Sequence, residues 1–475
     1  MIQDYYSFNL EASDDLMEAY LSVSPINESA PSLTEEDIKD YLKKFHITQG
    51  LDEKNIAEIV SKGRCYRVPV ANGEPSKDGD DAFFESLINI PLYETTIDPK
   101  LLETFDIKNT DNIVPTVPAG TPLMRKIPAT EGKSGKDVFG RPLPPGKPGK
   151  DKPLYKGKNT DFDPNDPNIL ISTIEGYPIV GQCYVNIEPI KYFRNGLKIE
   201  IRERDEKVEF DGIIVVFGTV GDGITIRSSA DVIIIGAVGA VLIEAQRNVI
   251  ISGGVTGKQM SVVKTRGSVI SRFLEMCTIE SGRDVIADDI TQSFVISCGK
   301  VVCKRIVGGE ITATYLVEAD SIGLEKGDTG ITVGVNPYIE DYFLKRVRED
   351  MDKKIIEKQE IMKEIKRLVF SKEPEEKERL QELRNSLPKI EQEIYMLKDI
   401  ESGLLELEKM SDKAQIISHE EILAGVMIVM RVQDQEFDYF VEEDMGGMIF
   451  KAGKYGIIRE EIGSEEENIS EEEVN

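Results

Sequence analysis

The chain lacks tryptophan, and both histidine and basic residues are scarce. Its 475 residues include no Trp, two His, and 58 Lys and Arg against 86 Asp and Glu, which leaves a formal net charge of −28. A charge of this size favours solubility and, averaged over the molecule, repels nucleic acid and anionic membranes. Binding to either of them therefore requires a local basic patch.

Long apolar runs are absent as well, and cysteine is sparse. No run of about 18 apolar residues occurs, so we expect no helix that spans a membrane. The N-terminal residues MIQDYYSFNLEASDD carry acid where a secretory signal peptide would carry base. The chain has five cysteines, an odd number scattered along its length, which is typical of reduced thiols rather than of a disulfide framework. These features predict a cytoplasmic protein.

What the chain does have is a regular repeat of short β-branched runs, such as DVIIIGAVG, NVIISGGVTG and DVIADDIT. A near-constant step without helical periodicity predicts a β-solenoid over 208–335, in which each turn buries aliphatic side chains in a continuous column. A β-sandwich is the alternative, although it does not require equal steps, and the number of faces per turn stays open. The recurring position, at steps of 16 to 20 residues, is occupied by Val215, Val232, Val249, Val269, Val285, Val301 and Val317.

Before this repeat, short helices and strands alternate. In SLTEEDIKDYLKKF, Thr34 followed three residues later by Asp37 predicts the capped start of a helix, and LDEKNIAEIV predicts a second helix. The Gly- and Pro-broken stretch that follows predicts short strands. We interpret 1–112 as an N-terminal α+β region and 113–207 as a Gly/Pro-rich basic β region.

After the repeat, the pattern becomes helical. Asn336 followed by Pro337 predicts a helix start, and SKEP at 371–374 predicts a break. Two helices joined by a short break predict an antiparallel coiled-coil hairpin over 336–412, which we expect to protrude and to bind a partner or a second copy of the chain. Its apolar seam, the candidate interface, consists of Leu380, Leu383, Leu387, Ile390, Ile394 and Leu397.

The C-terminal residues combine strands with an acidic end. Strand signals resume in EEILAGVMIVMRVQDQEFDYFV, and we expect 413–458 to form β strands that return to the solenoid. The sequence of 459–475, REEIGSEEENISEEEVN, is too acidic and too poor in apolar residues to bury a core, so it is predicted to be a disordered tail.

The stretch VPAGTPLMRKIPATEGKSGKDVFGRPLPPGKPGKD is dense in Gly, Pro and Lys. Its GKS at 132–134 resembles the end of a phosphate-binding loop, but Ile127 replaces the required glycine and prolines flank the motif on both sides, which excludes such a loop. Residues 117–158 carry ten Lys and Arg against three acids. This local excess is a candidate surface for an acidic partner segment or nucleic acid, with a solvated surface as the alternative. The candidate residues are Arg125, Lys126, Lys133, Lys136, Arg141 and Lys147.

No pattern of catalytic or metal-binding residues stands out. TDFDPNDPN at 160–168 resembles the start of a calcium loop, but Asp166 and Ser172 stand where an EF-hand needs Gly and Glu, so the stretch predicts a turn. Cys298 and Cys303 lack zinc spacing and are predicted to be buried core thiols. We therefore expect no enzyme activity, no cofactor and no metal.

Several motifs extend over nearly the whole chain: ITQGLDEKNI and VPVANGEPSKDGDDA, then the Gly/Pro-rich stretch with GKNTDFD and LISTIEGYPIV, then IVGGEITATYLVEADSIG and AGVMIVMRV on either side of the helical insert. Together they resemble the bacterial flagellar assembly protein A family. The resemblance implies a right-handed β-helix similar to that of bactofilins. It also implies a non-enzymatic cytoplasmic protein, linked in some members to flagellar assembly and cell-pole organisation.

Two functions stay open at this point. The first is a scaffold that places flagellar components at the cell pole or the inner face of the membrane through protein–protein contacts, with homo-oligomers among its assemblies. The second is an RNA- or nucleotide-binding regulator that uses the basic residues of 117–158, which the acidic chain disfavours. A carbohydrate-active solenoid enzyme is a more distant third, because the chain has no Trp to form a sugar platform.

Overall fold

The computed structural model describes most of the chain, and these residues divide into two compact units. Unit 1 combines the N-terminal residues with a later segment, Arg125–Leu154, and unit 2 contains Ser86–Met124 and everything from Tyr155 onward. Residues 125–154 thus pack with the N-terminal region, although the sequence predicted a boundary at 112/113. The described residues are 2–27, 30–89, 114–198, 206–324, 328–370, 373–433, 435–453 and 456–462.

Unit 1 contains a three-stranded antiparallel sheet with two helices. The strands are β1 (Tyr6–Ala12), β2 (Glu18–Pro25) and β3 (Cys65–Asn72), in the order β1-β2-β3, after a short helical turn η1 (Ile2–Asp4). Helices α1 (Glu35–Lys44) and α2 (Glu53–Lys62) bury Ile38, Leu42, Ile56 and Ile59 together with Leu21 of the sheet. The predicted helix start is confirmed, because the Thr34 hydroxyl accepts a hydrogen bond from Asp37 N and the Asp37 carboxylate accepts one from Thr34 N.

Several short strands follow along the chain. These are β4 (Phe83–Ser86), β5 (Pro122–Ile127), β6 (Ser134–Lys136), β7 (Pro142–Pro145), β8 (Thr160–Asp163), β9 (Asp166–Ser172), β10 (Tyr177–Val180) and β11 (Val185–Glu188). β8 and β9 form an antiparallel hairpin, as do β10 and β11. The stretch that resembles a calcium loop is the β8–β9 turn, where Asp163 Oδ1 accepts a hydrogen bond from Asn165 N at 2.8 Å. The predicted turn is therefore confirmed.

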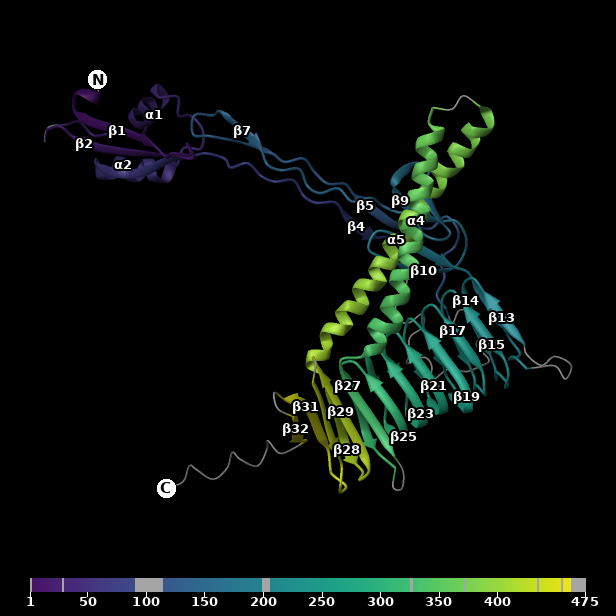
Figure 1. Ribbon diagram of the computed structural model, residues 1–475. Coiled ribbons are helices and arrows are strands. Elements are labelled where there is room, and N and C mark those ends of the chain that lie inside the picture. Colours follow the sequence, from purple (N-terminus) through teal and green to yellow (C-terminus); the bar gives the residue numbers. More distant parts are fainter. Residues whose placement is uncertain are drawn as a thin grey trace, which may run out of the picture. The chain divides into compact units, whose positions relative to one another are not determined.

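The rest of unit 2 confirms the predicted β-solenoid, which has about seven turns. In Figure 1 its strands form a stack of arrows running from β13 towards the C-terminal strands. Within the stack each strand pairs in parallel with the strand one turn further along. The strands are β12 (Ile190–Phe193), β13 (Lys207–Phe210), β14 (Ile213–Phe217), β15 (Thr225–Ser228), β16 (Val232–Ile235), β17 (Leu242–Ala245), β18 (Val249–Ile251), β19 (Val255–Thr265), β20 (Val269–Ser271), β21 (Phe273–Ser281), β22 (Val285–Ile286), β23 (Asp289–Ser297), β24 (Lys300–Val302), β25 (Arg305–Ala313), β26 (Leu316–Ile322), β27 (Thr329–Gly334), β28 (Gln415–Ile422) and β29 (Val426–Val432).

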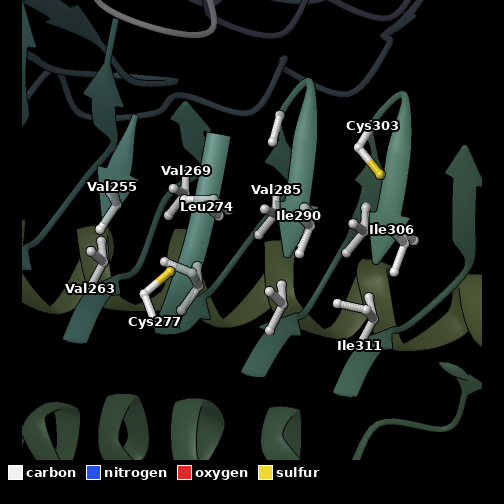
Figure 2. Packing of buried hydrophobic residues seen from close by; sticks show 14 of the residues in the cluster. Val255, Val263, Val269, Leu274, Cys277, Val285, Ile290, Cys303, Ile306 and Ile311 are labelled. Carbon is white, nitrogen blue, oxygen red and sulfur yellow. The ribbon is translucent and has the colours of Figure 1, made fainter. Parts of the chain in front are cut away.

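Three columns of stacked aliphatic side chains fill the solenoid, so each turn contributes three inward faces. The labelled side chains in Figure 2 all lie in this interior, for example Val269, Val285, Ile290 and Ile306. The first column is Ile214, Val232, Val249, Val269, Val285, Val301, Val317 and Ile416. The second is Val208, Ile226, Ile243, Val263, Ile279, Val295, Ile311, Ile331 and Ile428. The third is Val220, Val238, Val255, Leu274, Ile290, Ile306, Ile322 and Ile422.

One member of the predicted valine column is wrong by one residue. Ile214, not Val215, pairs with Val232 and points inward, whereas Val215 pairs with Ile233. Val215 and Ile233 belong to a separate buried cluster that includes Tyr177 of β10, on the outer side of these strands. Since neighbouring residues of a strand point to opposite faces, a strand covered on both sides is apolar throughout, and spacing alone does not reveal its inward residues.

A polar residue that directly precedes several of these valines has a structural role at the corner of the solenoid. Asp231 Oδ1 accepts a hydrogen bond from Asn248 N at 2.7 Å, and Asn248 Oδ1 accepts one from Ser268 N at 2.9 Å. Further along, Asp284 Oδ1 accepts from Lys300 N at 3.0 Å. The side chain of one turn thus satisfies the backbone donor of the next turn, at a bend where the strand ladder is interrupted.

The helical hairpin is inserted into the last turn of the solenoid. It comprises a π-helical segment η2 (Ile339–Leu344), α4 (Lys345–Leu368), α5 (Pro374–Lys409), which contains Pro388, and a final turn η3 (Met410–Lys413). As predicted, Asn336 caps its start, accepting a hydrogen bond from Tyr338 N at 3.1 Å. The chain then resumes the solenoid with β28, which pairs in parallel with β26.

Antiparallel strands close the C-terminal end of the solenoid. β30 (Gln435–Phe440) pairs with β29, β31 (Met448–Gly453) pairs with β28, and β32 (Gly456–Glu461) pairs with β31. Their residues Val441, Met448 and Phe450 complete the interior core. β32 includes the first residues of the predicted acidic tail, and the remainder of that tail, 463–475, lies outside the described residues.

Candidate functional site

Three of the six basic candidates, Lys133, Lys136 and Lys147, lie in a glycine-rich bundle of unit 1. Here three extended segments, 73–82, 130–137 and 142–150, run together and share backbone hydrogen bonds, such as Lys133 N to Lys77 O at 2.8 Å and Gly79 N to Lys147 O at 2.8 Å. The GKS motif lies in one of these segments and has no helix after it. We call this assembly the glycine bundle.

Glycine is required in the glycine bundle because the backbones touch. A Cβ at Gly132 would lie 2.0 Å from Gly146 O, and one at Gly149 would lie 1.9 Å from Asp80 O. Gly135 and Gly146 are equally crowded, so each of two segments has glycines three residues apart at its inner edge. This is the spacing by which collagen keeps three extended chains in contact. The repeated GKSGK and GKPGK patterns are the sequence signal of this packing. The comparison of GKS with a phosphate-binding loop did not predict it.

The charges of the basic candidates are largely offset by neighbouring acids. Lys126 Nζ lies 2.8 Å from the Asp151 carboxylate, which lowers the pKa of Asp151, and Arg141 lies 3.5 Å from Asp137. Arg125 is 3.9 Å from Glu85. The Lys133, Lys136 and Lys147 segments run beside residues 74–85, which carry five acids and one base. The local basic excess seen in the sequence is therefore reduced by an acidic segment of the same unit.

The predicted helical seam lies along the hairpin as expected for an antiparallel pair. Leu383, Ile390 and Ile394 are buried, and Leu380, Leu387 and Leu397 are half-buried. Ion pairs cross between the helices, from Lys354 to Glu393 at 2.7 Å and from Lys358 to Glu391 at 2.8 Å. These two lysines interrupt the apolar pattern of α4 without leaving a gap for another chain, because glutamates of α5 meet their charges.

The hairpin does not stand free of the rest of unit 2, which corrects the expectation of a protruding arm. Ile339, Phe343 and Leu344 at its base pack with Cys298 of the solenoid, which is fully buried. Further along α5, the Tyr395 hydroxyl donates a hydrogen bond to Gln182 Oε1 at 2.9 Å, and the ring lies next to Tyr155 and Tyr184. Figure 1 shows α4 and α5 side by side above the stacked strands.

A groove of about 610 Å³ lies between the base of the hairpin and one face of the solenoid. Its floor is a column of alternating charges in strand register, made of Glu209, Arg227, Glu244, Lys264 and Glu280. Ion pairs link this column, for example Arg227 to Glu209 at 3.0 Å and Lys264 to Glu280 at 2.9 Å. Because strands in register lie about 4.8 Å apart, each charge has an opposite charge as its neighbour.

The other wall of the groove carries Tyr342, Phe343 and Arg346. Arg266 reaches across the groove to Asp350 of α4 at 3.4 Å. Burial and the nearby Arg346 lower the pKa of Arg266. The lining residues include four cations and four anions, so the groove has no excess charge of either sign and favours a mixed polar ligand over a simple anion.

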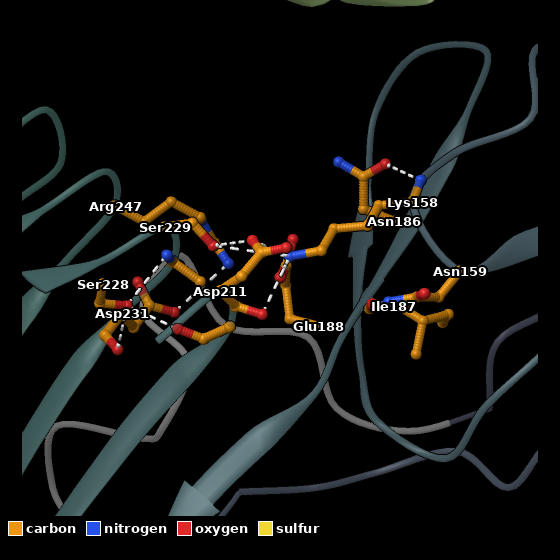
Figure 3. A network of polar contacts seen from close by, with 12 residues as sticks. Lys158, Asn159, Asn186, Ile187, Glu188, Asp211, Ser228, Ser229, Asp231 and Arg247 are labelled. Carbon is orange, nitrogen blue, oxygen red and sulfur yellow. Dashed lines mark hydrogen bonds and ion pairs between the residues drawn. The ribbon is translucent and has the colours of Figure 1, made fainter. Parts of the chain in front are cut away.

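A polar network joins the β10–β11 region to the first turns of the solenoid (Figure 3). Lys158 Nζ lies 2.7 Å from Glu188 Oε2 and 2.6 Å from Asp211 Oδ1, and Ser229 Oγ donates to the same Asp211 oxygen at 2.6 Å. Burial raises the pKa of Glu188, whereas Lys158 lowers the pKa of Asp211. Each of these groups is used in holding two parts of unit 2 together, which indicates a structural role.

The five cysteines are reduced thiols, of which Cys65 is partly buried and the other four are buried. Cys298 and Cys303 are buried, as predicted, and burial raises the pKa of Cys298 to about 12 and that of Cys277 to about 11. In the part of the chain that the structure describes, no group of three or more His, Cys, Asp or Glu could hold a metal ion. Nor is any of the described helices long and apolar enough to cross a membrane.

These features define a class of protein: a β-solenoid with a helical hairpin inserted in its last turn and an α+β unit before it. Two family models match the chain, the Flagellar Assembly Protein A N-terminal region over residues 8–182 and the Flagellar Assembly Protein A beta solenoid domain over residues 207–457. The chain therefore belongs to the Flagellar Assembly Protein A family. A search of curated proteins and a search of solved structures found no match.

Proposed function

We propose that the protein is a non-enzymatic cytoplasmic scaffold for flagellar assembly, acting through protein–protein contacts at the cell pole or the inner face of the membrane. The family name supports a link to flagellar assembly. A scaffold needs a stiff body that holds a binding element in a fixed place. The continuous aliphatic columns of the solenoid provide the stiff body, because close-packed interiors resist deformation.

The observation that carries the proposal is the way in which the hairpin is held. Gly334 N and Gln415 N, at its two ends, donate hydrogen bonds to Thr314 O and Tyr315 O of the preceding turn, both at 3.0 Å. Contacts at Cys298 and Tyr395 then fix its direction. The hairpin is thus attached at both ends and again at Tyr395, partway along α5, as expected of an element that presents a surface to a partner.

A deletion strain tests this proposal. Cells without the gene should have fewer or misplaced flagella by electron microscopy, and the wild-type chain supplied from a plasmid should restore them. A fluorescent fusion of the functional chain should gather at the pole or along the inner membrane. Flagella normal in number and position in the deletion strain would contradict the proposal.

The second function, an RNA- or nucleotide-binding regulator, receives less support. It depends on the basic residues of 117–158, and several of these are paired with acids of the same unit, such as Lys126 with Asp151. Phosphate binding would have to compete with these existing pairs.

A further inference from the structure

The groove between the hairpin and the solenoid has a balanced charge in sum, but its two ends differ. Asp211, Ser229, Gln246 and Arg266 line the groove, and each follows a residue that is paired in register, so they occupy equivalent positions in four successive turns. Strands in register lie about 4.8 Å apart, which places Asp211 and Arg266 about 14 Å apart along the stack. We call the side of Asp211 the acidic end of the groove and the side of Arg266 the basic end.

Two arginines at the basic end are incompletely paired. Arg346 of α4 is exposed and lines the groove, and its side chain forms no hydrogen bond or ion pair with any described residue. Arg266 pairs with Asp350 at 3.4 Å, and Lys353 lies 3.2 Å from the same carboxylate group. Guanidinium groups bind carboxylates through parallel, charge-assisted hydrogen bonds. The basic end can therefore hold an acidic group of a ligand.

Carboxylates are in surplus towards the acidic end. Arg227 pairs with Glu209 at 3.0 Å and also with Glu244, so these three groups together keep one negative charge. Asp211 lies at the same end and pairs with Lys158 (Figure 3). A basic group of a ligand would complete the pairing of these carboxylates, because complementary charge favours binding in one orientation.

Aromatic side chains add an apolar contact to these charges. Tyr342 and Phe343 line the groove, and both belong to the π-helical segment η2. Segments of this kind are rare and occur frequently at functional sites. Tyrosine and arginine are also the residues that often dominate the binding energy of protein interfaces. The wall of the groove thus has the composition of a protein-binding surface.

We propose that the groove binds an extended segment of a partner protein, with an acidic side chain at the basic end and a basic side chain at the acidic end. An extended chain advances about 3.3 Å per residue, so charges about 14 Å apart lie about four residues apart in the partner's sequence. The groove volume of about 610 Å³ is within the range of ligand sites. A simple anion would leave the surplus carboxylates without a partner.

The inference rests on the scaffold function proposed above and names the chemistry of its partner. It is tested in vitro, so it can fail while the flagellar phenotype stands.

Selection from a phage-displayed library of random hexapeptides, on the full-length protein at low salt, tests the proposal. The wild type should enrich peptides in which an Asp or Glu lies three to five residues from a Lys or Arg. Gln246→Trp places a large side chain in the groove and should not enrich these peptides. Because Gln246 is exposed, the melting temperature of this variant should equal that of the wild type.

Charge reversal at the basic end tests the orientation of the bound segment. Arg346→Glu should weaken the binding of a selected peptide about fivefold or more in fluorescence anisotropy, because the acidic side chain then meets a like charge. The same peptide with its acid changed to Lys should bind Arg346→Glu more tightly than it binds the wild type. Lys345→Glu is the matched control, since Lys345 is exposed on α4 beside the groove and its reversal should leave the affinity unchanged.

Three results would overturn the proposal: a wild type that enriches the same peptides as Gln246→Trp, selected peptides that lack the two opposite charges, or an Arg346→Glu protein that binds the selected peptide as tightly as the wild type does.

Discussion

Val317 and Ile416 lie side by side in parallel register, although the entire helical hairpin separates them in the sequence. One turn earlier, Thr314 and Tyr315 alone connect β25 to β26. The hairpin therefore replaces a two-residue corner, and the hydrogen-bond ladder continues on its far side. Because the ladder continues past the hairpin, removing the hairpin tests whether the solenoid needs it to fold.

We expect the solenoid to fold without the hairpin. Replacing 337–412 by a short Gly-Ser linker should keep the β signal in circular dichroism and cooperative unfolding. The variant should be less stable by about 1–3 kcal/mol, because Cys298 and its neighbours lose their apolar cover. Denaturant unfolding measures the loss, and a chain that does not fold at all would show that the hairpin is part of the core.

Adjacent residues of β22 distinguish the inner from the outer face. Val285→Asp would bury an unpaired charge in the first column and should destabilise the protein by roughly 3 kcal/mol or more. Ile286→Asp is the matched control, because Ile286 points outward and is 37% exposed; its effect should be much smaller. Equal melting temperatures for the two variants would mean that the inward face is assigned wrongly.

The glycine bundle should not tolerate a methyl group at its inner edge. In Gly149→Ala the new Cβ would meet Asp80 O at 1.9 Å, so the segments must separate, at a cost of at least about 2 kcal/mol. Gly446→Ala is the control, because nothing lies within 4 Å of its added Cβ. Thermal unfolding of both variants checks this prediction, and a Gly149→Ala protein with wild-type stability would contradict it.

The basic residues within 117–158 should not bind nucleic acid. Arg125, Lys126, Lys133 and Lys136 changed together to Ser should leave the protein folded. We expect wild-type protein purified at about 50 mM salt, where phosphate contacts are strong, to carry no nucleic acid. The ratio of its absorbance at the nucleic-acid maximum to that at the protein maximum measures this. Nucleic acid that co-purifies with the wild type but not with the variant would instead favour the regulatory function.

The buried thiols should make the protein less stable in alkali. In the unfolded chain a thiol ionises near its ordinary pKa of 9.0, whereas in the folded protein the pKa of Cys298 is raised to about 12 and that of Cys277 to about 11. The unfolded state thus loses protons that the folded state keeps. The free energy of unfolding should therefore fall as the pH rises above 9.0, the pKa of the thiols in the unfolded chain, towards their raised pKa values in the folded protein.

Urea unfolding of the wild type and of a Cys277→Ala, Cys298→Ala variant measures this effect. The variant should lose less stability than the wild type between about pH 8 and about pH 10. At the lower pH, Cys65, which is only partly buried, should react first with a thiol reagent. Identical pH slopes in the two proteins would refute the assignment.

The sequence predicted the elements whose pattern is local and repeated. The valine steps gave the solenoid, Asn336 with Pro337 gave the start of the hairpin, and Thr34 with Asp37 gave the first helix, because each signal depends on neighbours in the chain. The inward residue of β14 was missed, since Tyr177 covers the outer face and leaves both sides of the strand apolar. That cover comes from a distant segment, which spacing does not reveal.

The candidate sites were harder to predict for a similar reason. In the sequence, the lysines of 117–158 form a basic excess because the acids of 74–85 lie in a separate stretch. The backbone contacts of the glycine bundle bring these lysines and acids close together, and the sequence does not show those contacts. The anchorage of the hairpin by Tyr395 likewise joins segments far apart in the sequence.

The antiparallel strands β30 to β32 give the solenoid a fixed length. A stack of parallel turns grows when a further strand adds to its open edge, and these strands occupy that edge with the opposite chain direction. Every turn advances the stack by about one strand spacing, 4.8 Å. The number of turns therefore makes the solenoid a molecular ruler, and inserting one 16-residue repeat before the cap would lengthen it by one step of this size.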